Sequence, residues 1–223
     1  MTEETILQID KELLREGLSK YTRKAFHMLP KSDKLHILDV GCGSGVPTME
    51  LARLSQGEVI GIDIDQPTLN KLTNKIREAG LSDRVKTINC SISNMDFPDE
   101  SFDIIWSEGS IFVIGFKSGL QEWKRFLKPN GFLVVHDEIG NITEKLNQIS
   151  SCGYELLDYF TLPEDTWWIE YYAPLEKRIN EIRAKYADAP KALVAFDNDQ
   201  REIDMFKKNP RQYGSAFFIM KKR

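Results

Sequence analysis

Three glycines at alternate positions follow one apolar run, and an acid ends the next apolar run. The apolar run is Leu35–Val40, and the acid, Asp63, comes 18 residues after the last glycine. The glycines are Gly41, Gly43 and Gly45. Glycines let the backbone approach a ligand without a Cβ in the way, and a helix that starts after the turn points its amides at that ligand. A carboxylate at the end of the second strand can accept both hydroxyls of a ribose. Together the two features indicate a nucleoside site.

Asp39 and Val46 indicate which nucleoside fits. A dinucleotide site has the pattern G-x-G-x-x-G, whereas this chain has G-x-G-x-G with Val46 in place of the last glycine. Asp39 stands two residues before the first glycine, where it would repel a pyrophosphate. The same acid suits a ligand that carries an ammonium group and a sulfonium, and S-adenosylmethionine carries both.

Two short polar stretches follow later apolar runs and offer chemistry. They are Ser107-Glu108-Gly109 and His136-Asp137-Glu138. Methyl transfer from a sulfonium mainly requires an aligned nucleophile, exclusion of water and, for some acceptors, a group that takes a proton. Glu108 is the candidate for orienting an acceptor or its positive charge, and His136 is a candidate general base near neutral pH. The structural alternatives are that Glu108 binds the cofactor or caps the next segment, and that His136 is an ordinary packed histidine.

Strands and helices alternate along the chain in a way that can position these residues. Strands are predicted at Leu35–Val40, Glu58–Ile62, Val85–Cys90, Phe102–Ser107, Phe132–Asp137, Tyr154–Leu162 and Ser215–Lys221. Helices are predicted at about 3–16, 19–29, 46–55, 66–79, 115–127, 142–151, 175–186 and 193–206. Asp65 is a plausible N-cap and Gly80 a helix stop. The pattern predicts an α/β protein with a Rossmann-like, doubly wound, mostly parallel seven-stranded sheet and helices on both faces.

The segment between the last two predicted strands is far longer than a turn requires. We therefore expect residues 163–212 to form a helical insertion that acts as a substrate lid or lobe, separate from a core domain of residues 31–162 plus 213–223. Trp167, Trp168 and Tyr171 open this insertion at helical spacings. These aromatic side chains are predicted to bind an apolar or cationic acceptor, or alternatively to anchor the insertion.

The chain resembles the class I S-adenosylmethionine-dependent methyltransferases that act on small molecules. Four stretches carry the resemblance, in the family's order: LDVGCGSG (38–45), VIGIDID (59–65), NCSISNMDFPDESFDIIWSEG (89–109) and LKPNGFLVVHDE (127–138). They cover about residues 20–140. The resemblance implies the Rossmann-like fold, the cofactor S-adenosylmethionine and a set of cofactor-binding residues. That set is Thr22, Asp39, Gly41, Gly43, Gly45, Asp63, Ile64, Ser91 and Ile92.

The resemblance also implies roles for some of these residues. Asp63 would hold the ribose and Ile64 would pack on the adenine. Many relatives have an aspartate where this chain has Ser91, so adenine recognition would fall to the Ser91 hydroxyl and the backbone of Ile92. Thr22 matches the N-terminal part, residues 1–30, whose helices often close over the methionine carboxylate in relatives.

Composition excludes several function classes. The 223 residues carry a net charge of −4 and lack a long basic cluster, which argues against a nucleic-acid substrate. The [DNS]PP[YF] element of nucleobase amino methylation is missing, because Trp106-Ser107-Glu108-Gly109 stands in its place. The cysteines, Cys42, Cys90 and Cys152, are far apart, so no metal site is expected. With no signal peptide or long apolar run, we expect a cytoplasmic monomer or homodimer without membrane contact.

The sequence therefore predicts an S-adenosylmethionine-dependent methyltransferase that modifies a small-molecule acceptor. Two alternatives stay open. One is an NAD(P)-dependent oxidoreductase, which the glycine spacing and Asp39 disfavour. The other is a module that binds S-adenosylmethionine without catalysing a reaction.

Overall fold

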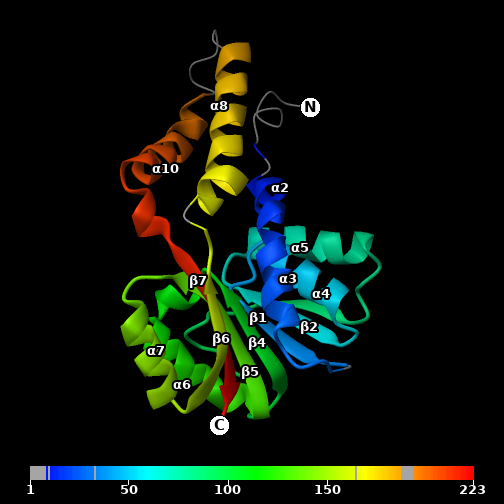
Figure 1. The fold of residues 1–223 in the computed structure, drawn as a ribbon. Coiled ribbons are helices and arrows are strands. Elements are labelled where there is room, and N and C mark those ends of the chain that lie inside the picture. The colour runs from blue at the N-terminus through cyan, green and yellow to red at the C-terminus, as the bar shows by residue number, and fades with distance from the viewer. Residues whose placement is uncertain (1–8, 10, 33, 164, 187–192) are drawn as a thin grey trace. The chain divides into compact units, whose positions relative to one another are not determined.

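A seven-stranded sheet organises the protein, whose structure is a computed structural model (Figure 1). The structure describes residue 9 and residues 11–32, 34–163, 165–186 and 193–223. The chain divides into two compact units. The larger unit contains residues 19–162 and 215–223, and the smaller unit contains residues 163–214 together with the N-terminal residues up to Leu18.

The sheet has the mostly parallel, doubly wound arrangement that the sequence predicts. Its strands are β1 (His36–Val40), β2 (Glu58–Asp63), β3 (Val85–Asn89), β4 (Phe102–Glu108), β5 (Leu127–Glu138), β6 (Tyr154–Thr161) and β7 (Ser215–Lys222). They lie in the order β3-β2-β1-β4-β5-β7-β6, and β7 is antiparallel to both of its neighbours. The chain order reverses between β1 and β4, which is where open α/β sheets place their ligands. The predicted fold class is confirmed.

Helices of the larger unit lie on both faces of the sheet (Figure 1). They are α3 (Ser19–His27), α4 (Val46–Leu54), α5 (Gln66–Glu78), α6 (Phe116–Trp123) and α7 (Ile142–Ser151), with the 3₁₀ turns η2 (Ile111–Val113) and η3 (Lys124–Phe126). Successive residues of β1 belong to different apolar clusters. Ile37 packs with residues of α3, α4 and α5, whereas Leu38 packs with residues of α6 and α7. This alternation explains why the central strands are apolar on both faces.

Local signals in the sequence fix the ends of α5. The Asp65 carboxylate accepts a hydrogen bond from the Thr68 amide at 3.2 Å and so caps the helix. Gly80 follows the helix with a φ of 67°, a conformation that glycine adopts without strain. Asp65 and Gly80 thus mark the two ends of the helix that connects β2 to β3.

Strand β5 differs from the prediction at its start. It was predicted to begin at Phe132 but begins at Leu127, because the turn-forming residues Pro129-Asn130-Gly131 are part of the strand. Asn130 has a φ of 61°, and the pairing with β4 shifts register between Phe102 and Ile104. The turn residues therefore produce an irregularity within a strand and do not end it.

The smaller unit is helical and has its own apolar core. Its elements are α2 (Lys11–Arg15), η1 (Glu16–Leu18), the π-helical turn η4 (Trp168–Tyr172), α8 (Ala173–Lys185), η5 (Val194–Phe196), α10 (Asp197–Lys208) and η6 (Pro210–Tyr213). Its core residues are Tyr171, Tyr172, Leu175, Ile179, Ile182, Phe196, Ile203 and Phe206.

The sequence predicts residues 1–30 as one N-terminal part, but the boundary between the two units falls within it. Helix α3 belongs to the larger unit, whereas residues up to Leu18 belong to the smaller one. The first residues of the helix expected at 3–16 lie outside the described residues, and so does the stretch between the helices expected at 175–186 and 193–206. The roles of these parts as closing helices and substrate lid stay predictions. Within the described residues, each helix is too short or too polar to cross a lipid bilayer.

Shortening a side chain in the central strand β4 should cost far more stability than the same change at the sheet edge. Ile104 is 1% exposed, whereas Ile88 on the edge strand β3 is 40% exposed. We expect Ile104→Ala to lower the free energy of unfolding by about 2–5 kcal/mol, because it opens a cavity. Ile88→Ala is the control, with an expected loss of about 1 kcal/mol or less. Urea denaturation measures both, and equal losses would contradict the assigned core.

Candidate cofactor and active site

The glycine turn leaves β1 at the carboxyl edge of the sheet and is held against β2. The amides of Gly41 and Cys42 both donate to the Ile62 carbonyl at 2.9 Å. The φ angles of Gly41, Gly43 and Gly45 are 72°, 51° and 88°. Only glycine adopts these values readily, which explains the three glycines. A Cβ added at Gly43 would meet no atom within 4 Å, so this part of the turn faces open space.

Asp63 at the end of β2 contacts the turn directly, so the structure brings together the two features that the sequence linked. Its Oδ2 accepts a hydrogen bond from the Gly43 amide at 2.9 Å, and its Oδ1 accepts one from the Asp65 amide at 2.9 Å. Each carboxylate oxygen can accept more than one hydrogen bond. Asp63 thus shapes the turn and still has acceptor capacity for a ligand hydroxyl.

Asp39 lies in β1 behind the turn and is almost completely buried, at 1% exposed. The Thr48 hydroxyl on α4 donates to its Oδ2 at 2.6 Å. Burial raises the pKa of Asp39 to about 7, and the nearby carboxylates of Glu108 and Asp63 add to the increase. In the part of the chain that the structure describes, no cation pairs with Asp39. A ligand cation would therefore stabilise the ionised form.

Glu108 at the end of β4 connects the sheet to α3. Its Oε1 accepts hydrogen bonds from the Thr22 hydroxyl at 2.8 Å and from the Trp106 indole at 2.7 Å. Burial raises the pKa of Glu108 to about 7 despite these two bonds. Thr22 is 2% exposed, so this contact fixes the helix that the sequence assigned to cofactor closure.

His136 pairs with Glu108 across β4 and β5, but its surroundings differ. Its ring stacks on Phe217 with centroids 4.4 Å apart, and the residue is 8% exposed. Burial lowers the pKa of the imidazole to about 4. His136 is consequently neutral at pH 7 and a weak base, which favours the packed-histidine alternative over the predicted general base.

The loop after β3 lies beside the end of β2. The Cys90 amide donates to the Asp63 carbonyl at 3.0 Å, and the Asn89 side chain donates to the Ile64 carbonyl at 2.9 Å. The Ser91 hydroxyl accepts from the Ser93 amide at 3.3 Å. Ile64 is 72% exposed and so is available to pack on a planar group. The structure thus places Ile64 and the Ser91 loop at the same edge as Asp63.

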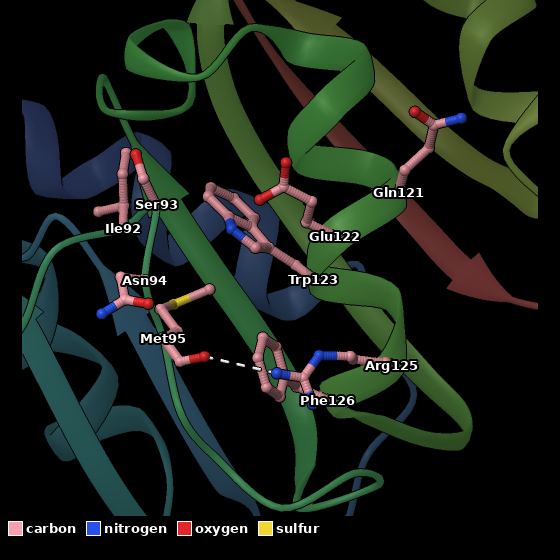
Figure 2. A pocket seen from close by; sticks show the side chains of 9 residues that line it. All are labelled: Ile92, Ser93, Asn94, Met95, Gln121, Glu122, Trp123, Arg125 and Phe126. Carbon is pink, nitrogen blue, oxygen red and sulfur yellow. Dashed lines mark hydrogen bonds between the residues drawn. The ribbon is translucent and has the colours of Figure 1, made fainter.

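A pocket of about 380 Å³ separates this loop from the end of α6, and Figure 2 shows its lining. The lining residues are Ile92, Ser93, Asn94, Met95, Gln121, Glu122, Trp123, Arg125 and Phe126. The Arg125 guanidinium donates to the Met95 carbonyl at 3.4 Å and pairs with Asp99 at 2.8 Å, which ties the loop to the helical segment. Ile92 is the one cofactor-assigned residue in the lining, so the pocket adjoins the glycine-turn site without containing it.

The predicted acceptor-binding aromatics lie in the smaller unit. Tyr171 is 3% exposed and belongs to that unit's core. Trp168 stacks on Phe206 at 6.1 Å, and Trp167 meets Tyr171 edge to face at 6.4 Å. The packing of Tyr171 favours the anchoring alternative, whereas Trp167 and Trp168 are half-buried.

Sequence reasoning missed Ser110, which locks the turn from the other side. Its hydroxyl donates to the Val40 carbonyl at 2.6 Å and lies 2.7 Å from the Ser107 hydroxyl. A Cβ added at Gly41 would lie 2.3 Å from the Ser110 Cβ. No motif marks this serine, because its partner lies 70 residues away in the chain. Among the described residues, no cluster of three His, Cys, Asp or Glu side chains is placed to hold a metal ion.

The larger unit contains a region that is similar to known proteins. A family described as a methyltransferase domain matches residues 37–131. These residues match the kind of domain that the sequence predicts, that of a class I S-adenosylmethionine-dependent methyltransferase. A sterol 24-C-methyltransferase of Gibberella zeae is 23% identical over 197 residues, which is 75% of this chain and 52% of that protein. The methyltransferase GfsG of Streptomyces halstedii is 32% identical over 125 residues, which is 56% of this chain and 45% of GfsG. The chain spans about half the length of the sterol methyltransferases that it matches.

Solved structures share the fold of this chain. An S-adenosylmethionine-dependent methyltransferase of Geobacter sulfurreducens, solved with S-adenosylhomocysteine, matches with a TM-score of 0.72 and 19% identity over 93% of this chain and 91% of that one. The [4+2]-cyclase SpnF matches with a TM-score of 0.72 and 22% identity over 91% of this chain and 80% of that one. These structures confirm the predicted fold, and the cyclase illustrates that the fold alone does not decide the reaction.

Removing the charge of Asp39 should stabilise the ligand-free protein at high pH. The unfolded carboxyl ionises near its ordinary pKa of 3.8, whereas the folded carboxyl keeps its proton up to about pH 7. Wild-type stability therefore falls as the pH rises between these values and is constant above them. An amide still accepts from Thr48 but does not titrate, so we expect Asp39→Asn to gain about 2 kcal/mol at pH 8 and much less at pH 5.

Urea denaturation at both pH values measures this difference. Asp83→Asn is the control, since Asp83 is exposed in the same unit and its removal should leave the pH dependence unchanged. An equal gain at pH 5 and pH 8 would contradict a raised pKa at Asp39.

Proposed function

We propose that this chain is an enzyme that transfers the methyl group of S-adenosylmethionine to a small-molecule acceptor. The observation that carries the proposal is the hydrogen bond between the Gly43 amide and the Asp63 carboxylate, because it joins a glycine turn to an acid that is predicted to bind ribose, beside the switch point of the sheet. The buried Asp39 adds a negative charge behind the turn. Relatives named as methyltransferases, and a neighbouring structure that holds S-adenosylhomocysteine, support the same assignment.

The residues of the site fit S-adenosylmethionine. The open space in front of Gly43 leaves room for a ligand against the turn. Asp63 would accept the ribose hydroxyls, and Ile64 and the Ser91 loop would contact the adenine. Asp39 would stabilise the positive charge of the methionine end. When bound, the cofactor supplies a methyl group on a positively charged sulfur, which leaves as a neutral thioether.

The protein's contribution is to align the acceptor, exclude water and hold a proton. Glu108 is the proposed catalytic residue, because its carboxylate lies at the end of β4 and its pKa near 7 allows it to take a proton at neutral pH. The Thr22 and Trp106 donors fix its orientation. The low pKa of His136 makes that residue a poor second candidate. Trp167, Trp168 and Tyr171 stay proposed acceptor contacts.

We also propose that the protein acts in the cytoplasm as a monomer or homodimer and does not act on nucleic acid. The net charge of −4 supports a small-molecule acceptor. The thiols of Cys42, Cys90 and Cys152 are free, as expected for a reducing compartment.

Calorimetric titration with S-adenosylmethionine, S-adenosylhomocysteine and NAD tests the proposal. We expect the first two ligands to bind and NAD to fail, because Asp39 repels a pyrophosphate. Binding of NAD alone would overturn the assignment. Formation of S-adenosylhomocysteine during long incubation, measured by mass spectrometry, distinguishes an enzyme from a module that only binds.

Loss of the Asp63 carboxylate should weaken cofactor binding strongly. Asp63→Ala removes the proposed ribose acceptor and the partner of the Gly43 amide. We expect a loss of about 2 kcal/mol or more, or roughly 30-fold in Kd for S-adenosylhomocysteine. Asp83→Ala, which removes an exposed acid from the same unit, should leave the affinity unchanged. Unchanged affinity in a folded Asp63→Ala variant would exclude the ribose assignment.

A further inference from the structure

Two large apolar side chains stand exposed directly after the proposed catalytic segment. Phe112 and Val113 are 63% and 62% exposed, whereas Ile111 beside them is 0% exposed. All three form the 3₁₀ turn η2, which starts three residues after Glu108. Scattered apolar residues on a surface are normal. Two adjacent ones that closely follow the proposed catalytic Glu108 in the chain need an explanation.

The turn is held rigidly, so these side chains are not exposed through disorder of the segment. The Gly109 amide donates to the His136 carbonyl at 2.9 Å, and Gly109 has a φ of 65°. The Val113 amide donates to the Ser110 carbonyl at 3.1 Å. Ile111 packs closely on α6, since a Cβ added at Gly119 would lie 2.6 Å from its side chain. The buried Ile111 thus anchors the turn and presents its two neighbours to solvent.

The turn itself offers apolar side chains and no charge to a ligand. Residues 109–115, GSIFVIG, carry no ionisable side chain. The nearest acid along the chain, Glu108, already accepts two hydrogen bonds on Oε1, from Thr22 and Trp106. For an amine, the segment therefore offers only Glu108, which already accepts two hydrogen bonds. For an apolar group, it offers the exposed side chains of Phe112 and Val113.

From this arrangement we infer that Phe112 and Val113 bind the apolar part of the methyl acceptor and select apolar acceptors over small cationic amines. The inference rests on the proposed function, because it places the acceptor beside Glu108. It adds the substrate class and two residues that determine specificity. Contact with Phe112 buries apolar surface on both partners, which supplies affinity without a directional bond.

Calorimetry on the whole protein saturated with S-adenosylhomocysteine tests the inference, with geraniol as the apolar probe and sarcosine, a zwitterion that carries an ammonium group, as the amine probe. We expect geraniol to bind and sarcosine not to bind. Phe112→Ser should weaken geraniol binding about tenfold, and Val113→Ser should weaken it less, because the smaller side chain buries less area. Phe112→Leu keeps an apolar surface and should stay within about threefold of the wild type.

Ile88→Ser is the matched control, since it removes an exposed apolar side chain from the edge strand of the same sheet. Its geraniol affinity should equal that of the wild type, and the affinity for S-adenosylhomocysteine should be unchanged in every variant. Binding of sarcosine in place of geraniol, absence of geraniol binding, or full affinity in Phe112→Ser would overturn the inference. Failure of the wild type to bind S-adenosylhomocysteine would instead overturn the proposed function.

Discussion

The hydrogen bond between the Gly43 amide and the Asp63 carboxylate joins two strand ends into one binding surface. It can form because β1 and β2 are parallel neighbours in register, so that their carboxyl ends reach the same edge. The left-handed glycines bring the backbone close enough to the acid, and no other residue type does so without strain. Without this contact the turn and the acid would be two unrelated features.

The site carries more negative charge than its surroundings compensate. Asp39 and Glu108 both have a raised pKa near 7, mainly because they are withdrawn from water. Such groups cost stability in the ligand-free protein. The cost is understandable if a cation normally occupies the site, since the positive charge of S-adenosylmethionine would offset it. A fold selected for stability alone would not bury two carboxylates at one edge of a sheet.

Residues at the end of β4 and just after it contact several parts of the site. Glu108 bonds to α3 through Thr22, Ser110 bonds to the end of β1, and Ile111 packs on α6. Three residues within positions 108–111 thus contact elements from different parts of the larger unit. This concentration explains why the segment combines a proposed catalytic acid with a positioning serine and the exposed apolar pair that follows it.

Much of the fold follows from local patterns. Periodic apolar residues located the strands, and caps such as Asp65 set the ends of α5. The predicted start of β5 at Phe132 was wrong, because the strand already pairs with β4 at Leu127 and resumes this pairing at Phe132 after an irregular stretch. A local turn signal does not distinguish an irregularity within a strand from the end of that strand.

The sequence by itself determined the glycine turn, the acid that follows it and the parallel sheet, because each depends on residues close together in the chain. Only the tertiary structure decided the pKa values of the polar side chains, and hence their protonation at neutral pH. Burial against Phe217 made His136 a weak base, and burial in β1 and β4 raised the pKa of Asp39 and Glu108. Desolvation depends on what packs around a group, and those neighbours come from distant parts of the chain.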